Sequence, residues 1–291
     1  MELALADLLA LAASEDLDEV ERAHQAALFR MGQEQEARVV AAMAYDRGRA
    51  LAGREQKFGT QAVLSAGGQK LWPIEPTTTD SERAKWGLGP LASLHAQAVD
   101  APLIGKAPLR KVLRERRQML DATALACWSK DVAEHGVRVL QPTAACAIVA
   151  LYWPLPGEVD PRPLALLLAE QCGARLALPV VKGGNMTFRE WAATASLEPA
   201  GYGTFGPTAD AVELTPTMVL APMLGFDRHG GRLGQGKGYY DRTLLPRDGE
   251  HDQLVVGIAG TCQELPMVPT LAHDRRLDML ITEVEATTFA R

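Results

Sequence analysis

Short apolar runs alternate with helical patterns from about residue 105 onwards, and this alternation limits the possible folds more than any other feature. Runs such as ACAIVALYW, TMVLAPML and QLVVGIAG are rich in small and β-branched residues, as buried strands are. Between them, PRPLALLLAEQCG has proline near its start and glycine at its end, the asymmetry typical of a helix. We therefore expect an α/β fold, a central and mostly parallel sheet with helices on both faces.

The N-terminal part has a different pattern and contains no catalytic motif. Apolar positions recur at helical spacing over residues 3–51, which predicts one short and one long helix with Ser14 as a cap. Residues 53–100 are rich in glycine, threonine and proline and have little periodicity, so we expect a long loop or linker. The sequence thus predicts a helical N-terminal extension of unknown role over residues 1–104, followed by an α/β domain over residues 105–291.

Composition is that of an ordinary globular chain with a small negative charge. Of 291 residues, 47% are hydrophobic and 23% charged, and the formal net charge of −6 argues against a general binder of nucleic acid or anionic membranes. Glu2 and Asp7 stand where a secretion signal would carry positive charge. The four cysteines include no C-x-x-C pair, so we expect buried, reduced thiols and a cytoplasmic protein.

The most informative segment is APMLGFDRHGGRLGQGKGYYDR, residues 221–242, in which a predicted buried strand continues into a glycine-rich loop. Closely spaced glycines let backbone N–H groups approach an anion, and Arg232 and Lys237 add positive charge. We therefore expect a polyphosphate site, with Asp241 placed to hold the Mg²⁺ that such a phosphate brings. A helix beginning near Tyr239 would add its positive end.

Two common nucleotide motifs are excluded by the spacing of this loop. A Walker A loop requires serine or threonine directly after its lysine, whereas Gly238 follows Lys237. The GQGKG run also lacks the spacing of a dinucleotide-binding fingerprint. A surface loop with scattered charges is the remaining alternative to a phosphate site.

The run RLGQGKGYYDR, preceded by APMLGFDRHG, resembles the signature of the 5-formyltetrahydrofolate cyclo-ligase family, whose members are also called methenyltetrahydrofolate synthetases. Further segments follow in the order typical of that family: KAPLRKVLRERRQML, LYWPLPGEVD, LPVVKGGNMTF, LEPAGYGTFGPT and VPTLAHDRRLDMLITE. The resemblance covers about residues 105–285. It implies an α/β fold and the conversion of 5-formyltetrahydrofolate to 5,10-methenyltetrahydrofolate with ATP and Mg²⁺, yielding ADP and phosphate.

The reaction implied by the resemblance begins with phosphorylation of the formyl oxygen. The second folate nitrogen then attacks the activated carbon, and phosphate leaves. Such a reaction needs positioning and charge neutralisation more than a protein nucleophile.

The resemblance also assigns the nucleotide-binding residues. Lys106 and Arg110 lie four residues apart in KAPLRKVLRERRQML, which is predicted to be a basic helix at the start of the α/β domain. They therefore project from one face and could reach a triphosphate together. The other basic residues of that helix are interpreted as a solvated surface. The loop residues implied to wrap the phosphates are Arg232, Leu233, Gly234, Gln235, Gly236, Lys237, Gly238, Tyr239 and Tyr240. Among these, the resemblance implies catalytic roles for Lys237, Arg232 and Tyr240; Gln235 occupies a position that is often arginine or glycine in relatives.

For the metal, the resemblance assigns Asp241 and Asp274, although a turn-capping role for Asp274 is an equal alternative. Asp278 is expected to begin the last strand. The folate-contacting residues that the resemblance implies are Trp153, Glu158, Met186, Phe188, Gln235 and Tyr239, with Glu198 a weaker candidate. A carboxylate such as Glu158 suits a pterin ring, whose amino and ring N–H groups are donors. Met186 and Phe188 point the same way on a strand and could equally be core residues.

Two other functions are compatible with the same residues. A non-catalytic relative could keep the pocket for binding, with the N-terminal helices as an interaction module. A phosphoryl-transfer enzyme could act on another N-formyl or pterin compound. Catalysis is favoured because all the key charged residues are present: Lys106, Arg110, Glu158, Arg232, Lys237 and Asp241. We expect a reduced folate and ATP as partners, no nucleic acid or membrane, a slight preference for a monomer, and an extension dispensable for chemistry.

Overall fold

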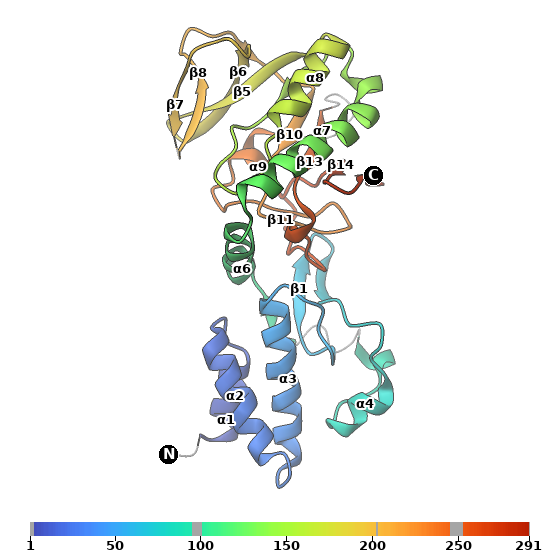
Figure 1. Cartoon of the computed structure of the whole chain (residues 1–291). Helices are drawn as coiled ribbons and strands as arrows, with labels where there is room; N and C mark the ends of the chain where they lie inside the picture. Colours follow the sequence, from blue (N-terminus) through green and yellow to red (C-terminus); the bar gives the residue numbers. More distant parts are fainter. Residues whose placement is uncertain (1–2, 95–100, 202, 245–252, 291) are drawn as a thin grey trace. The chain divides into compact units, whose positions relative to one another are not determined.

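The structure, a computed structural model, describes residues 3–94, 101–201, 203–244 and 253–290 (Figure 1). The chain divides into two compact units. The first comprises residues 1–112 and 265–272, and the second comprises residues 113–264 and 273–291. Helix α6, Lys106–Gln118, begins in the first unit and ends in the second.

The second unit is built on an eight-stranded sheet with the order β15-β14-β13-β10-β4-β5-β6-β9. Its neighbours from β14 to β5 are parallel, whereas β15, β6 and β9 pair antiparallel at the sides. The strands are β4 (Ile148–Ala150), β5 (Arg175–Lys182), β6 (Asn185–Trp191), β9 (Glu213–Leu214), β10 (Met218–Ala221), β13 (Leu254–Ile258), β14 (Met279–Ile281) and β15 (Ala286–Thr288). The helices are α7 (Ala122–Ala144), α8 (Arg162–Cys172) and α9 (Tyr239–Thr243). The expected α/β fold with a mostly parallel sheet is confirmed.

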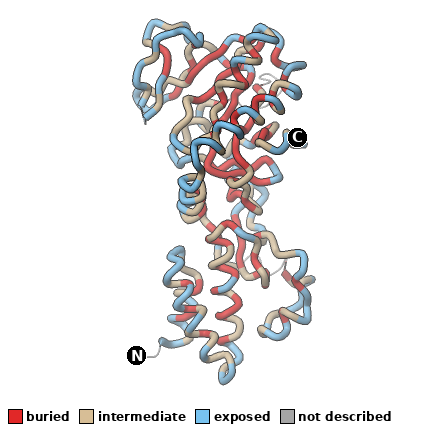
Figure 2. The backbone as a smooth tube through the Cα atoms, viewed as in Figure 1, coloured by how far each residue is buried: buried red, intermediate tan, exposed pale blue. Residues whose placement is uncertain are grey.

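The central strands are buried on both faces, as their continuous apolar sequences predicted (Figure 2). Along β10, Met218 and Leu220 belong to one apolar cluster and Val219 and Ala221 to another, which follows the two-residue period of a strand. The first cluster includes buried residues of α7 and α8, and the second includes the tyrosines at the start of α9. The start of α9 is therefore packed against one of the two apolar clusters.

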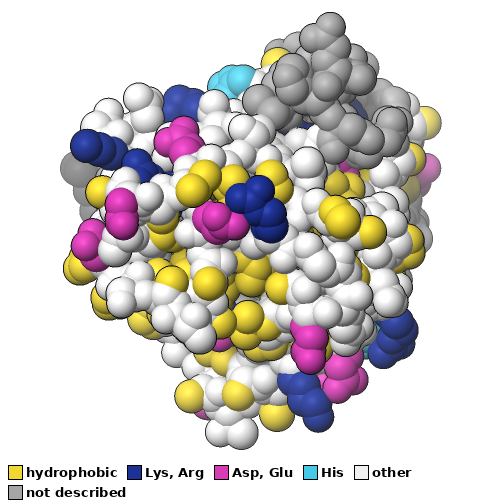
Figure 3. Space-filling view, turned by 90° about the horizontal axis from the view of Figure 1, so that it is seen from above, with side chains coloured by type: hydrophobic (Ala, Val, Ile, Leu, Met, Phe, Trp, Pro, Cys, Tyr) yellow, Lys and Arg dark blue, Asp and Glu magenta, His cyan; other side chains and the backbone are white. Residues whose placement is uncertain are grey.

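Two hairpins complete the second unit. β11 (Gly225–Phe226) pairs antiparallel with β12 (Arg232–Leu233), and β7 (Leu197–Gly201) pairs antiparallel with β8 (Thr204–Pro207). Figure 3 looks onto the end of this unit that carries the β7–β8 hairpin and α8, where apolar side chains lie in the middle of the face and most charged ones nearer its edge. The β11–β12 hairpin belongs to the predicted phosphate loop.

The first unit begins with three helices rather than the expected two. These are α1 (Leu5–Ala12), α2 (Leu17–Arg30) and α3 (Gln35–Leu51). The side chain of Asp16, not that of Ser14, caps α2, because it accepts the N–H groups of Asp18 and Glu19. Ser14 instead accepts the N–H of Asp16.

The expectation of a structureless linker over residues 53–100 is wrong for the described part, residues 53–94; residues 95–100 lie outside it. β1 (Ala62–Ser65), β2 (Gly68–Leu71) and β3 (Leu103–Ile104) form a three-stranded sheet, and α4 (Asp80–Lys85) and a 3₁₀ turn, η1 (Leu91–Ser93), follow the hairpin. The fully buried carboxylate of Asp46 accepts the backbone N–H groups of Lys57, Phe58 and Thr60. Such bonds order a loop without any local periodicity.

Trp72 anchors this segment, and its replacement provides a test of the first unit's core. The indole is fully buried, and its N–H donates to the carbonyl of Arg54 at 2.7 Å. We expect Trp72→Ala to lower the free energy of unfolding by about 3–5 kcal/mol, because it leaves a cavity and an unpaired carbonyl. Phe29→Ala, at a side chain 85% exposed, should change it by less than about 0.5 kcal/mol. Urea unfolding followed by circular dichroism measures both, and equal effects would contradict this core assignment.

None of the four cysteines forms a disulfide, but they are less buried than expected. Cys127 and Cys146 are exposed, and Cys172 and Cys262 are half-buried. In the part of the chain that the structure describes, no helix is long and apolar enough to cross a membrane.

Candidate active site

The phosphate loop starts with a tight hairpin that Asp227 organises. This side chain is 2% exposed, and its Oδ1 accepts the backbone N–H groups of His229 at 2.8 Å and Gly231 at 2.9 Å. These bonds close the turn between β11 and β12. Asp227 therefore shapes the loop from within.

Arg232, which begins the glycine-rich run RLGQGKG of the loop, is buried and paired with the proposed metal ligand. Its Nη2 donates to Oδ1 of Asp241 at 2.5 Å, and its guanidinium carbon lies 5.7 Å from the centre of the Tyr240 ring. The Nε atom is buried and has no hydrogen-bond partner among the residues that the structure describes. A buried N–H without an acceptor is costly, so this atom would be stabilised by an anion that reached it.

The remainder of the loop exposes Lys237 and leads into α9. Gly238 has a φ of +66°, a conformation that favours glycine, and the guanidinium of Arg242 donates to the carbonyl of Lys237 at 3.0 Å. The expected helix does begin at Tyr239, but it has only five residues. Its dipole is correspondingly small, so we assign the positive potential of the loop to its side chains.

The predicted folate carboxylate, Glu158, lies beside this loop. Its side chain is 6% exposed, and its Oε1 accepts from Nη1 of Arg117 at 2.9 Å while its Oε2 accepts the N–H of Leu155 at 2.9 Å. Burial raises the pKa of Glu158, and this effect is opposed by hydrogen bonds from Leu155, Arg117 and the side chain of Gln235. The structure therefore brings together Glu158 and Gln235, two residues predicted to contact the substrate.

Tyr240 is the second aromatic residue of YYDR and cannot act as a base near neutral pH. Burial raises the pKa of its phenol well above the ordinary value; Arg232 lowers that pKa and Glu158 raises it further. The phenol is therefore neutral, and its O–H is available as a hydrogen-bond donor.

Trp153 forms an aromatic contact next to this turn. The guanidinium carbon of Arg162 lies 4.5 Å from the centre of its ring, and Phe205 on β8 meets it edge-on at 5.8 Å between ring centres. Asp160 holds Arg162 through an ion pair of 2.6 Å. The side chain of Trp153 is half-buried and contacts both Arg162 and Phe205.

Met186 and Phe188 lie in the core, 6% and 3% exposed, as the alternative interpretation predicted. They belong to the same apolar cluster as Tyr239 and Tyr240. Their direct contact with folate stays a prediction, whereas their packing supports the aromatic residues of the loop. Glu198 is exposed on β7.

The proposed metal carboxylates differ in their surroundings. The side chain of Asp241 is 27% exposed, and that of Asp274 is 13% exposed and 4.0 Å from His273. Asp278 lies directly before β14, one residue outside the strand that it was expected to begin, and that strand is followed by β15. Asp278 accepts from the backbone N–H of Val255 and from Arg275. Within the described ranges, no group of three or more His, Cys, Asp or Glu side chains is arranged to hold a metal. Mg²⁺ often uses one or two carboxylates and completes its shell with water and phosphate oxygens, so Asp241 fits a metal that arrives with a nucleotide.

Helix α6 differs from the expected solvated basic surface. Lys106 and Arg110 are half-buried on its first half, which belongs to the first unit, and their nucleotide contact stays a prediction. In its second half, Arg116 donates to the carbonyls of Cys262 and Glu264, and Arg117 pairs with Glu158. The solvated interpretation is therefore wrong for Arg116 and Arg117. Spacing could have indicated the second of these, since Arg117 follows Arg110 by seven residues, two helical turns, and so shares its face.

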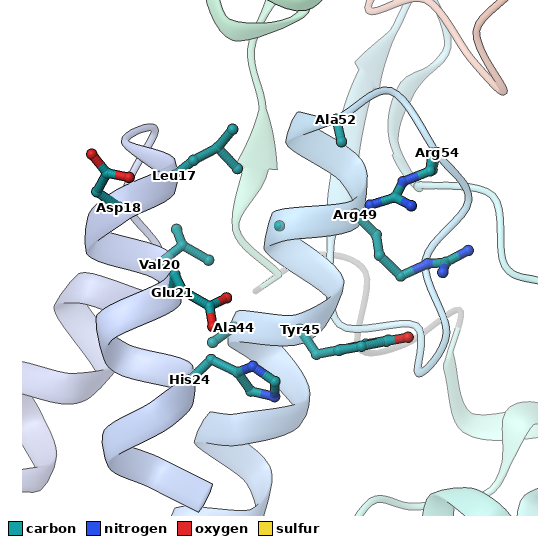
Figure 4. Close-up of a pocket in the computed structure, with 11 residues that line it drawn as sticks. Leu17, Asp18, Val20, Glu21, His24, Ala44, Tyr45, Arg49, Ala52 and Arg54 are labelled. Atoms are coloured by element: carbon teal, nitrogen blue, oxygen red, sulfur yellow. The ribbon is translucent and has the colours of Figure 1, made fainter.

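A separate groove of about 390 Å³ lies in the first unit between α2 and α3 (Figure 4). Its floor is formed by small and apolar side chains, among them Val20 and Ala44, and His24 and Tyr45 lie beside it with ring centres 5.7 Å apart. Burial lowers the pKa of His24, and Glu21 opposes this shift. None of the predicted site residues lines this groove.

The fold and the site of the second unit define an α/β enzyme in which a glycine-rich, cationic loop lies beside a buried carboxylate. Residues 104–283, more than half of the chain, match the 5-formyltetrahydrofolate cyclo-ligase family. The chain belongs to this family of ligases.

Individual relatives cover the same part of the chain. The 5-formyltetrahydrofolate cyclo-ligase of Escherichia coli K12 is 28% identical over 179 residues, which is 59% of this chain and 96% of the relative. The Haemophilus influenzae cyclo-ligase is 27% identical over 182 residues, 60% of this chain and 95% of the relative. The solved structure of Aquifex aeolicus 5,10-methenyltetrahydrofolate synthetase superposes with a TM-score of 0.54 at 30% identity, covering 64% of this chain and 93% of that one.

Proposed function

We propose that the chain converts 5-formyltetrahydrofolate to 5,10-methenyltetrahydrofolate and consumes ATP, with ADP and phosphate as products. The single observation that carries this proposal is the hydrogen bond between the side chains of Gln235 and Glu158. It places a carboxylate suited to a pterin ring next to a loop suited to phosphates, as transfer between a nucleotide and a folate requires.

The proposed reaction has two steps. The formyl oxygen attacks the terminal phosphorus of ATP, and the bond from that phosphorus to ADP breaks. N10 of the folate then attacks the formyl carbon and loses its proton, and the carbon–oxygen bond breaks to release phosphate. No covalent bond to the protein is needed, because phosphorylation turns the formyl oxygen into a good leaving group.

The chain's own residues would neutralise and orient the reacting groups. Arg232 and Lys237 place positive charge in the loop where the phosphoryl group would be transferred, and the neutral phenol of Tyr240 can donate a hydrogen bond. Glu158 would accept hydrogen bonds from the pterin. Mg²⁺ would neutralise phosphate charge, with Asp241 and, as a second candidate, Asp274 as its protein ligands.

The proposal is tested by mixing the full chain with 5-formyltetrahydrofolate, ATP and Mg²⁺ and following the absorbance band of methenyltetrahydrofolate. We expect the band to grow, with one ADP formed per product, and to require both ATP and Mg²⁺. Binding of folate and ATP without product would instead indicate a non-catalytic relative. If ATP is consumed with another N-formyl or pterin compound but not with this folate, the proposed substrate is wrong and the proposed class of reaction is retained.

A further inference from the structure

The carboxylate of Glu158 is held by a buried ion pair that comes from the end of α6. The side chains of Arg117 and Glu158 are 12% and 6% exposed, and Nη1 lies 2.9 Å from Oε1. The other oxygen, Oε2, is held by the backbone N–H of Leu155. Each oxygen of Glu158 therefore has its own anchor, so rotation of the carboxylate would break at least one buried hydrogen bond.

The turn that carries Glu158 is also shaped to receive Arg117. Gly157 has a φ of +80°, and a Cβ atom on it would lie 2.8 Å from Cγ of Arg117 and 3.2 Å from its carbonyl oxygen. Any side chain at this position would collide with the helix end. The backbone of the turn and the stem of Arg117 are thus in close contact, which fixes where the guanidinium meets the carboxylate.

Glu158 keeps room for further hydrogen bonds after these anchors are counted. An ionised carboxylate offers about four acceptor positions, and Arg117 and Leu155 use two of them. A third is used by the side chain of Gln235. The backbone carbonyl oxygen of Gln235 in turn accepts from Nη2 of Arg114 at 3.5 Å. One acceptor position of the carboxylate therefore remains for a ligand. Its direction is set by the three hydrogen bonds that come from α6, from the turn and from the phosphate loop.

We propose that Arg117 is a positioning residue for folate recognition. It holds the carboxylate of Glu158 in the orientation that faces the pterin ring. This inference rests on the proposed function. Arg117 would not touch the substrate itself. Without its charge, burial would favour the neutral form of Glu158, and a neutral acid is a weaker acceptor for the pterin N–H groups.

The test compares folate and ATP kinetics in two variants of the full chain. Arg117→Met removes the charge but keeps most of the stem that packs on Gly157, and Arg117→Lys keeps the charge. We expect Arg117→Met to raise KM for 5-formyltetrahydrofolate about tenfold, as loss of one charge-assisted hydrogen bond would do, and to leave KM for ATP within about twofold. Arg117→Lys should restore part of the loss. Lys111→Ala, at an exposed lysine of the same helix, is the matched control and should leave both constants unchanged.

A second comparison separates positioning from a purely structural role. In a Glu158→Gln background, Arg117→Met should have little further effect on KM for folate, because the group through which it acts has already changed. An equal effect in both backgrounds, an unchanged folate KM, or a parallel rise in both KM values would overturn the proposal. If Arg117→Met does not fold, a folate KM for Arg117→Lys between those of the unmodified chain and of Glu158→Gln, with an unchanged KM for ATP, would support the proposal. A folate KM for Arg117→Lys equal to that of the unmodified chain would contradict it. An unmodified chain without cyclisation activity would instead refute the proposed function.

Discussion

Lys237→Ala is expected to lower kcat for cyclisation by about 100-fold or more, with a smaller effect on KM for the folate. The lysine is exposed in the phosphate loop between Gly236 and Gly238, where a bound nucleotide would cover it. A charge that stabilises a transferring phosphoryl group acts mainly in the transition state, and removal of one such donor costs on the order of 10²–10³ in rate. Steady-state kinetics at saturating ATP measure the change.

A matched control for this variant is Lys130→Ala, at a lysine on α7 whose side chain is 77% exposed. It should retain the activity of the unmodified chain. A folded Lys237→Ala protein with near-normal kcat would show that the loop does not bind the reacting phosphate. Circular dichroism of both variants checks that each is folded.

Asp241→Asn is expected to reduce kcat by about 100-fold and to raise the Mg²⁺ concentration needed for half-maximal rate. The change keeps the size of the side chain and one oxygen for Nη2 of Arg232, which now lies 2.5 Å from Oδ1. It removes the negative charge that would hold Mg²⁺ against the phosphates. Rates measured across a Mg²⁺ titration separate this effect from a simple loss of activity.

The matched change Asp131→Asn on α7 should leave both the rate and the Mg²⁺ dependence unaltered. If Asp241→Asn lowers the rate but leaves the Mg²⁺ dependence unchanged, Asp241 serves as the partner of Arg232 and not as a metal ligand. If neither quantity changes, its role is confined to the local structure of the loop. In both cases the metal assignment would move to Asp274 or to a site formed by the nucleotide alone.

The sequence by itself determined the central strands of the sheet, the place of the phosphate loop along the chain, and the family. The strands β4, β10 and β13 are continuous apolar runs because both faces of the sheet are covered, so local composition was enough to locate them. The glycines and charges of the phosphate loop are adjacent in the sequence, and the start of α9 at Tyr239 followed from that local pattern. Features whose partners lie within a few residues can be predicted in this way.

The tertiary structure alone decided which charged side chains of the site form buried ion pairs and which residues are their partners. Arg117 and Glu158 lie 41 residues apart, so the spacing that places Arg117 on the same helix face as Arg110 could not show which acid it pairs with. The order of residues 57–60 likewise depends on the buried carboxylate of Asp46, which holds the backbone of a loop 11 to 14 residues further along the chain. A hydrogen bond between distant residues leaves no periodic trace in the sequence, because its two ends are brought together only when the chain packs.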